Sequence, residues 1–391
     1  MYTILLIVIY IAFIGLGLPD SLAGSGWPVM YLELNVPLSS LGLLTMTIAG
    51  GTIISSLLSD RLNRILSTKW VVIISTALTA LAMFGFSIST KFYMLILWAI
   101  PYGLGAGSID AALNNYVALH YTSRHMNWLH SFWGVGTIIS PYIMSYSLTN
   151  YNWNMGYRIV SYIQIGIVLI LLLSIPLWKK RQTVIEEVKP KVLGLFGTLK
   201  IKGVIFLLLA FFAYCSFEAM CMGWISTYLV KVREIDEKTA AAFASLFFIG
   251  ITVGRFISGF ISGKLGDRRM VRIGIITILL GLLLVAISII TPVLSLIGFV
   301  IVGFGCAPIY PSIIHSTPDN FGKENSQSIV GIEMASAYVG TTFMPPLFGL
   351  IASSTTFEIM PYYILIFVGL LILMMSLMYR NTRNKDEDKG C

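Results

Sequence analysis

Three acidic residues, Asp20, Asp110 and Glu218, lie inside long apolar stretches of this chain. An ionisable side chain at the centre of a membrane span costs about 2.5–3.5 kcal/mol on insertion scales, so it normally has a partner or a function. Burial away from water also favours the protonated carboxyl group, which can then bind and release a proton. The chemistry that these residues suggest is proton-coupled transport, with Asp110 and Asp20 as the proton carriers.

Asp110 lies on a small, polar helix face. Gly103, Gly107, Asp110 and Asn114 share one side of a helix by the i, i+3, i+4, i+7 rule. A lipid-facing surface would be large and apolar instead. The alternative is that Asp110 is a structural acid that bonds a neighbouring helix.

Asp20 follows Pro19, which has no backbone N–H and disturbs a helix interior. Interrupted helices expose backbone groups that can contact a substrate. We therefore expect Asp20 to bind either the proton or the substrate, with a structural acid as the alternative.

A set of polar and aromatic residues could bind a sugar, because sugars offer hydroxyl groups to amides and carboxylates and C–H faces to aromatic rings. Aromatic residues also form interfacial belts in membrane proteins, which is the alternative for the rings. The candidate substrate-binding residues are Asn114, Asn115, His130, Trp133, Trp27, Trp224, Glu218 and Tyr338.

Charged residues at two further places predict contacts that hold one conformation. Burying Arg255 or Glu333 alone would be severely unfavourable, so we expect the two to form an ion pair. Charged hinges follow the second and the eighth apolar stretches, where opposite charges at helix ends can pair. The candidate latch residues at these hinges are Asp60, Arg61, Arg64, Asp267 and Arg268.

The elements that position these residues are membrane-spanning helices. Hydrophobic residues make up 57% of the 391-residue chain and charged residues only 11%, against about 25% in a soluble domain. Each apolar stretch reaches the roughly 20 residues that a spanning helix needs, and none alternates as the strands of a barrel would. The expected spans are residues 3–32, 37–59, 70–89, 92–121, 128–149, 156–178, 203–230, 239–262, 271–290, 292–317, 326–352 and 360–379.

Most Lys and Arg residues fall on the side of the amino terminus when the expected loops are assigned to alternate sides. Cytoplasmic loops hold the excess of positive charge, so both termini should be cytoplasmic and the first span should be retained. The net charge of +8 is therefore explained by topology, and we expect no nucleic-acid partner.

The chain contains an internal repeat. Gly103 and Gly105 match Gly303 and Gly305 in order and in equivalent spans, and the hinge at Asp60 returns at Asp267. We expect a first six-helix half at 1–178, a cytoplasmic linker at 179–202 and a second half with a short tail at 203–391. Repeated halves commonly enclose a midplane site and alternate its access by rocking.

These motifs resemble the major facilitator superfamily. Asp60, Arg61 and Arg64 stand in its signature after the second span. A narrower resemblance is to the fucose/glucose–proton symporters. This chain has Asp110 where that branch has Glu, and it retains the Asn of that branch as Asn114. His130 and Trp133 replace two of its sugar-binding amides.

The resemblance implies an all-α fold of twelve helices in two pseudo-symmetric halves. It also implies proton-coupled symport of a sugar or related small polar solute. The alternative is a proton-coupled efflux pump for amphipathic compounds, and sodium could replace the proton. We expect no enzyme, because no nucleophile–base pair stands out, and no metal or other cofactor. We expect a monomer in a bacterial cell membrane, with a small-molecule substrate and the lipid bilayer as its partners.

Overall fold

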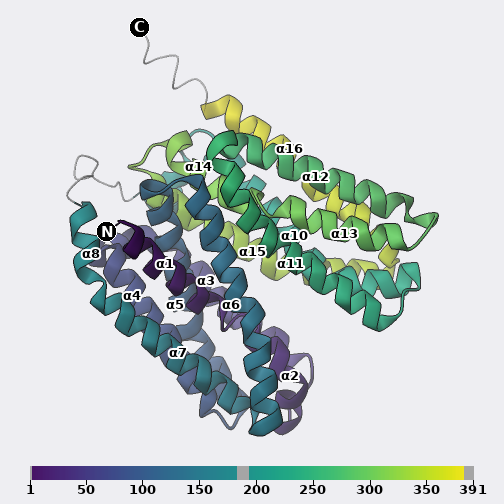
Figure 1. The fold of residues 1–391 in the computed structure, drawn as a ribbon, viewed down its shortest axis with the longest axis horizontal. Coiled ribbons are helices and arrows are strands. Elements are labelled where there is room, and N and C mark those ends of the chain that lie inside the picture. Colours follow the sequence, from purple (N-terminus) through teal and green to yellow (C-terminus); the bar gives the residue numbers. More distant parts are fainter. Residues whose placement is uncertain (1, 183–192, 383–391) are drawn as a thin grey trace. The chain divides into compact units, whose positions relative to one another are not determined.

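The computed structural model describes residues 2–182 and 193–382 (Figure 1). The elements in these ranges are helices, as expected for a chain whose backbone N–H and C=O groups must find partners inside a lipid bilayer. Their bounds are α1 Tyr2–Gly17, α2 Leu22–Glu33, α3 Ser40–Leu57, α4 Ser59–Ser87, α5 Phe92–His120, α6 Ser123–Asn150, α7 Trp153–Leu173, α8 Ile175–Gln182, α9 Gly194–Leu199, α10 Val204–Arg233, α11 Glu237–Leu265, α12 Asp267–Ala286, α13 Val293–Cys306, α14 Ile309–Phe321, α15 Ser326–Ser354 and α16 Met360–Thr382.

The membrane spans are helices, as the sequence analysis expected. Within the described residues, eleven helical segments are long and apolar enough to cross a membrane. The fifth expected span, 128–149, falls in α6, which is 28 residues long but is not among the eleven. α6 begins with the polar run Ser123–Asn127, which includes Arg124 and His125, and it contains Pro141.

Two spans are interrupted at proline residues. The first breaks between Gly17 and Leu22, around Pro19, so that α1 and α2 are separate helices. The tenth breaks between Cys306 and Ile309, around Pro308. The first interruption places Asp20 outside regular helix, as its proline predicted.

Some helix ends are capped by side chains. The Asp236 carboxylate accepts a hydrogen bond from the Thr239 backbone N–H at 2.9 Å at the start of α11. This N–H holds the pKa of Asp236 below its ordinary value, because the bond favours the ionised carboxylate. Asn152 caps α7 in the same way through the N–H of Met155.

The chain forms two compact units. Unit 1 comprises Met1–Tyr116, Leu129–Gly194 and Lys323–Ala335, and unit 2 comprises Val117–Trp128, Leu195–Gly322 and Ser336–Cys391. These bounds differ from the expected halves at two segments, 117–128 and 323–335, each of which packs in the unit of the other half. Of the expected linker at 179–202, residues 183–192 lie outside the described residues.

The repeated glycines make the same contacts in each unit. A Cβ on Gly103 would lie 2.2 Å from the carbonyl oxygen of Ile48 in α3, and one on Gly303 would lie 2.5 Å from that of Phe247 in α11. Gly105 likewise meets the backbone of α4, and Gly305 meets that of α12. Since α3 and α4 are followed by α5 as α11 and α12 are followed by α13, the internal repeat is also a repeat of helix packing.

Candidate functional site

Asp110 lies at one end of a buried chain of polar side chains in unit 1. Asn114, one turn further along α5, donates from Nδ2 to Asp110 Oδ1 at 2.7 Å. His130 Nε2, on α6, lies 2.9 Å from Asn114 Oδ1. An amide oxygen can only accept, so His130 must carry its proton on Nε2 when the amide is oriented this way. All three side chains are at most 6% exposed.

Each donor in this chain therefore points toward the Asp110 carboxylate. Such a chain links the acid, the amide and the imidazole through hydrogen bonds. The glycines of α5 bring α3 close on its other side. A Cβ on Gly107 would lie 2.4 Å from both Ser55 Oγ and Thr52 O. The small polar face expected around Asp110 is thus a helix-packing face as well as a polar one.

Asp20 forms a second polar group in unit 1. Tyr102 Oη on α5 donates to Asp20 Oδ1 at 2.6 Å, and Trp133 Nε1 on α6 donates to Oδ2 at 2.9 Å. Both carboxylate oxygens thus have donors, while Asp20 itself stays exposed. The interruption between α1 and α2 is what allows this side chain to reach two other helices.

Unit 2 contains a buried ion pair between α10 and α11. Arg255 Nη2 lies 3.1 Å from Glu218 Oε1, and Tyr214 Oη lies 2.9 Å from the same oxygen. The Arg255 guanidinium also lies over the Tyr310 ring, 5.7 Å from its centroid. A buried charge of either sign needs a partner, and these two supply each other.

The sequence analysis paired Arg255 with Glu333, whereas the ion pair that the structure records for Arg255 is with Glu218. Glu333 is fully buried and belongs to unit 1. The expected Arg255–Glu333 pair stays a prediction.

The candidate sugar-binding residues divide into several groups. Asn114 and His130 lie together beside Asp110, and Trp133 contacts Asp20. Trp27 and Trp224 donate their indole N–H groups to backbone carbonyls, of Leu38 at 2.8 Å and of Pro345 at 2.9 Å. Each of these two rings therefore ties segments of one unit together, and a substrate contact by either stays a prediction.

Two further candidates, Asn115 and Tyr338, are described by their own surroundings. Asn115 bonds the start of α15, where Gln327 Oε1 accepts from its amide at 2.7 Å and Ser326 Oγ donates to its oxygen at 2.5 Å. Tyr338 is half-buried in unit 2.

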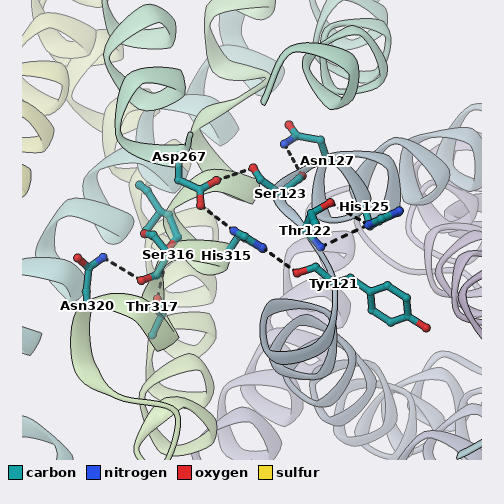
Figure 2. A network of polar contacts seen from close by, with 11 residues as sticks. Tyr121, Thr122, Ser123, His125, Asn127, Asp267, His315, Ser316, Thr317 and Asn320 are labelled. Carbon is teal, nitrogen blue, oxygen red and sulfur yellow. Dashed lines mark hydrogen bonds and ion pairs between the residues drawn. The ribbon is translucent and has the colours of Figure 1, made fainter. Parts of the chain in front are cut away.

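The repeated hinge acids occupy equivalent places in the two units. Asp60, at the start of α4, accepts from Ser328 Oγ at 3.1 Å. Asp267, at the start of α12, accepts from Ser123 Oγ at 2.5 Å and contacts His315 Nδ1 at 2.6 Å (Figure 2).

The hinge arginines behave differently from the acids. Arg61, Arg64 and Arg268 are exposed. The Arg268 guanidinium lies over the Tyr379 ring, 4.4 Å from its centroid. The acids thus make the hydrogen bonds described above, while Arg268 packs against an aromatic ring.

Sequence reasoning missed Tyr102 and Tyr214 as members of polar groups, and it considered His315 without placing it in one. No local signal marks Tyr102, because its partner Asp20 comes from another segment of the chain. For Tyr214 a local signal existed, since Glu218 lies four residues further along the same helix. For His315 a signal existed: the interval from Asn115 to His315 equals the interval from Gly103 to Gly303. The repeat thus makes the two residues equivalent.

Comparison with known proteins identifies the family. A family model described as Major Facilitator Superfamily matches residues 9–246 and 232–390. The chain is 23% identical over 314 residues to the glucose/mannose transporter GlcP of Bacillus subtilis, covering 78% of this chain and 76% of that one. It is 21% identical over 411 residues to Bypass of stop codon protein 6 of Saccharomyces cerevisiae, covering 96% and 82%.

Solved structures show the same fold. FucP, a major facilitator transporter in the outward conformation, has a TM-score of 0.73 at 15% identity, covering 94% of this chain and 98% of that one. The proton:xylose symporter XylE has a TM-score of 0.74 at 11% identity, covering 97% and 95%.

Proposed function

Because the chain belongs to the major facilitator superfamily, we propose that it is a secondary active transporter that moves a sugar or related small polar solute together with a proton. The chain is a multi-pass membrane protein, and its relatives are transporters rather than enzymes. The substrate class and the proton are the parts that we propose. GlcP is named as a glucose/mannose transporter and XylE as a proton:xylose symporter, and both names support this class.

The observation that carries the proposal is the buried chain Asp110–Asn114–His130. A proton-coupled carrier needs an acid whose protonation is transmitted to groups that bind substrate. Asn114 meets that need, since it contacts Asp110 directly and its amide can bond a sugar hydroxyl. His130 keeps the amide oriented through Asn114 Oδ1.

In the proposed cycle, a proton reaches Asp110 and removes the charge that holds Asn114. The amide is then free to bond a substrate hydroxyl instead. Asp20 would bind a second proton or a substrate hydroxyl, because Tyr102 and Trp133 hold its two oxygens in a fixed orientation. The halves would then rock to change access, as repeated transporters commonly do.

Purified protein in liposomes tests the proposal. With an acid exterior and no other gradient, radiolabelled hexose should accumulate inside, and a protonophore should abolish the accumulation. Accumulation driven only by a sodium gradient would show that the coupling ion is sodium and not a proton. If no sugar accumulates and the protein instead extrudes lipophilic cations, the efflux alternative holds and the sugar proposal is wrong.

We also propose that the protein acts as a monomer in a bacterial cell membrane, with both termini in the cytoplasm. The charge bias of the loops supports the orientation. Cys215, Cys221 and Cys306 are buried, so a membrane-impermeant thiol reagent should report on Cys391. Labelling in inverted vesicles but not in right-side-out vesicles is expected, and the opposite pattern would reverse the topology.

A further inference from the structure

His315 on α14 joins two parts of unit 2 that are far apart in the sequence. Its Nδ1 lies 2.6 Å from Asp267 Oδ2, at the start of α12. Its Nε2 lies 3.1 Å from the backbone oxygen of Tyr121, between α5 and α6. Ser123, at the start of α6, bonds the other oxygen of Asp267. Figure 2 shows the imidazole between the carboxylate and the Tyr121 carbonyl.

This arrangement requires two hydrogens, one on Nε2 and one between Nδ1 and Asp267 Oδ2. A backbone carbonyl can only accept, so the contact with Tyr121 needs a hydrogen on Nε2. A carboxylate also accepts, so the contact with Asp267 needs a second hydrogen between Nδ1 and Oδ2. A neutral imidazole carries only one N–H and can therefore make only one of the two contacts to an ionised acid and a carbonyl.

The repeat supplies a natural comparison. Asn115 occupies the equivalent position in the first half and also bonds a segment just after the neighbouring connection, through Ser326 and Gln327. Its amide makes these bonds at any pH, because an amide does not titrate in this range. Each residue thus contacts a segment from the other half of the sequence, Asn115 with a group that cannot bind a proton and His315 with a group that can.

We infer that His315 is a proton-binding site, separate from Asp110 and Asp20, whose bound proton ties the start of α12 to the connection between α5 and α6. Protonated His315 holds Asp267 and Tyr121 together. Loss of the proton removes one of the two hydrogen bonds and weakens the link between the start of α12 and the connection between α5 and α6. Acid therefore stabilises this arrangement, and raising the pH weakens it.

The side chains around the ring carry charges of both signs. Asp267 contacts it directly, and Asp319 adds a second negative charge one turn further along α14. Arg124 of α6 is directed toward Gly263 of α11, 4.0 Å from where its Cβ would lie, and Arg268 stacks on Tyr379 of α16. His125 of α6 bonds Thr122 instead.

Histidine NMR tests the proton directly and does not depend on transport. The chain has four histidines, so each ring of ¹⁵N-histidine-labelled protein in nanodiscs can be assigned by substitution. The signal lost in His315→Asn should be that of a ring with both nitrogens protonated at neutral pH. Asp267→Asn should convert this signal to that of a neutral ring. If the signal lost in His315→Asn is already neutral in the native protein, the inference is wrong.

Hydrogen exchange tests whether the protonated ring links the start of α12 to the connection between α5 and α6. Amides of 121–126 should exchange about tenfold faster at alkaline than at acid pH after correction for intrinsic rates, roughly the effect of losing one charge-assisted hydrogen bond. In His315→Asn this pH dependence should vanish, because the residue then matches Asn115. His125→Asn is the matched control, since His125 accepts from the Thr122 backbone N–H and needs no added proton, and it should keep the native pH dependence.

The two experiments separate this inference from the proposed function. A native protein that fails to accumulate sugar but shows the protonated His315 signal would contradict the transport proposal and leave the proton site standing. A pH dependence that persists in His315→Asn would overturn the inference even if sugar transport is found.

Discussion

At the residue scale, the candidate site depends on how each buried charge is partnered. The Asp110–Asn114 contact was within reach of sequence reasoning, because residues four apart on a helix face each other. The contacts of Asp20 with Tyr102 and Trp133 were not, since they join separate helices. The choice of Glu218 as an ion partner of Arg255 likewise depends on how α10 packs against α11.

Substitution of Asp110 by Asn tests the assignment of the proton. The change keeps the shape of the side chain and an oxygen that can accept from Asn114, but it removes the carboxyl group that binds the proton. We expect proton-driven accumulation to fall to the level of passive equilibration, while exchange of labelled for unlabelled solute continues. Glu in place of Asp110 is the matched control, because it restores a carboxyl group and should restore part of the accumulation. Asp110→Asn protein that accumulates solute as well as the native chain would show that another residue carries the proton.

At the element scale, prolines and glycines made the helices predictable. Pro19 and Pro308 mark interruptions that the structure shows between α1 and α2 and between α13 and α14. Ser67, by contrast, breaks the helical geometry of α4 with a φ of 64°, and no proline or glycine there announces it. Such a break is fixed by packing around the hinge and cannot be inferred from local residue preferences.

The close approach of α3 and α5 yields a stability prediction. Gly103→Ala would place a methyl group 2.2 Å from the Ile48 carbonyl oxygen, so backbone atoms must move. Overpacking of this kind costs about 1–3 kcal/mol. The apparent melting temperature of the purified protein should therefore fall clearly. Gly50→Ala on α3 is the control, because a Cβ there meets nothing within 4 Å. Equal melting temperatures for the two variants would contradict the described packing.

At the scale of the whole molecule, the repeat in the sequence predicted the family and the twin architecture. It did not predict that segments 117–128 and 323–335 would pack in the unit of the opposite half. Side-chain pairs far apart in the chain accompany that exchange, such as Ser328 with Asp60 and Ser123 with Asp267. Neither serine is distinguished by its surroundings in the sequence, so the pairs emerge only from the folded chain.

The central claim is that solute and proton move together, and proton entry is its most direct measurement. Liposomes that contain the protein and a trapped pH-sensitive dye are prepared with equal pH on both sides. Addition of the transported hexose outside should acidify the interior in the native protein and leave it unchanged in Asp110→Asn. Uptake of labelled hexose without any acidification of the interior would contradict proton-coupled symport.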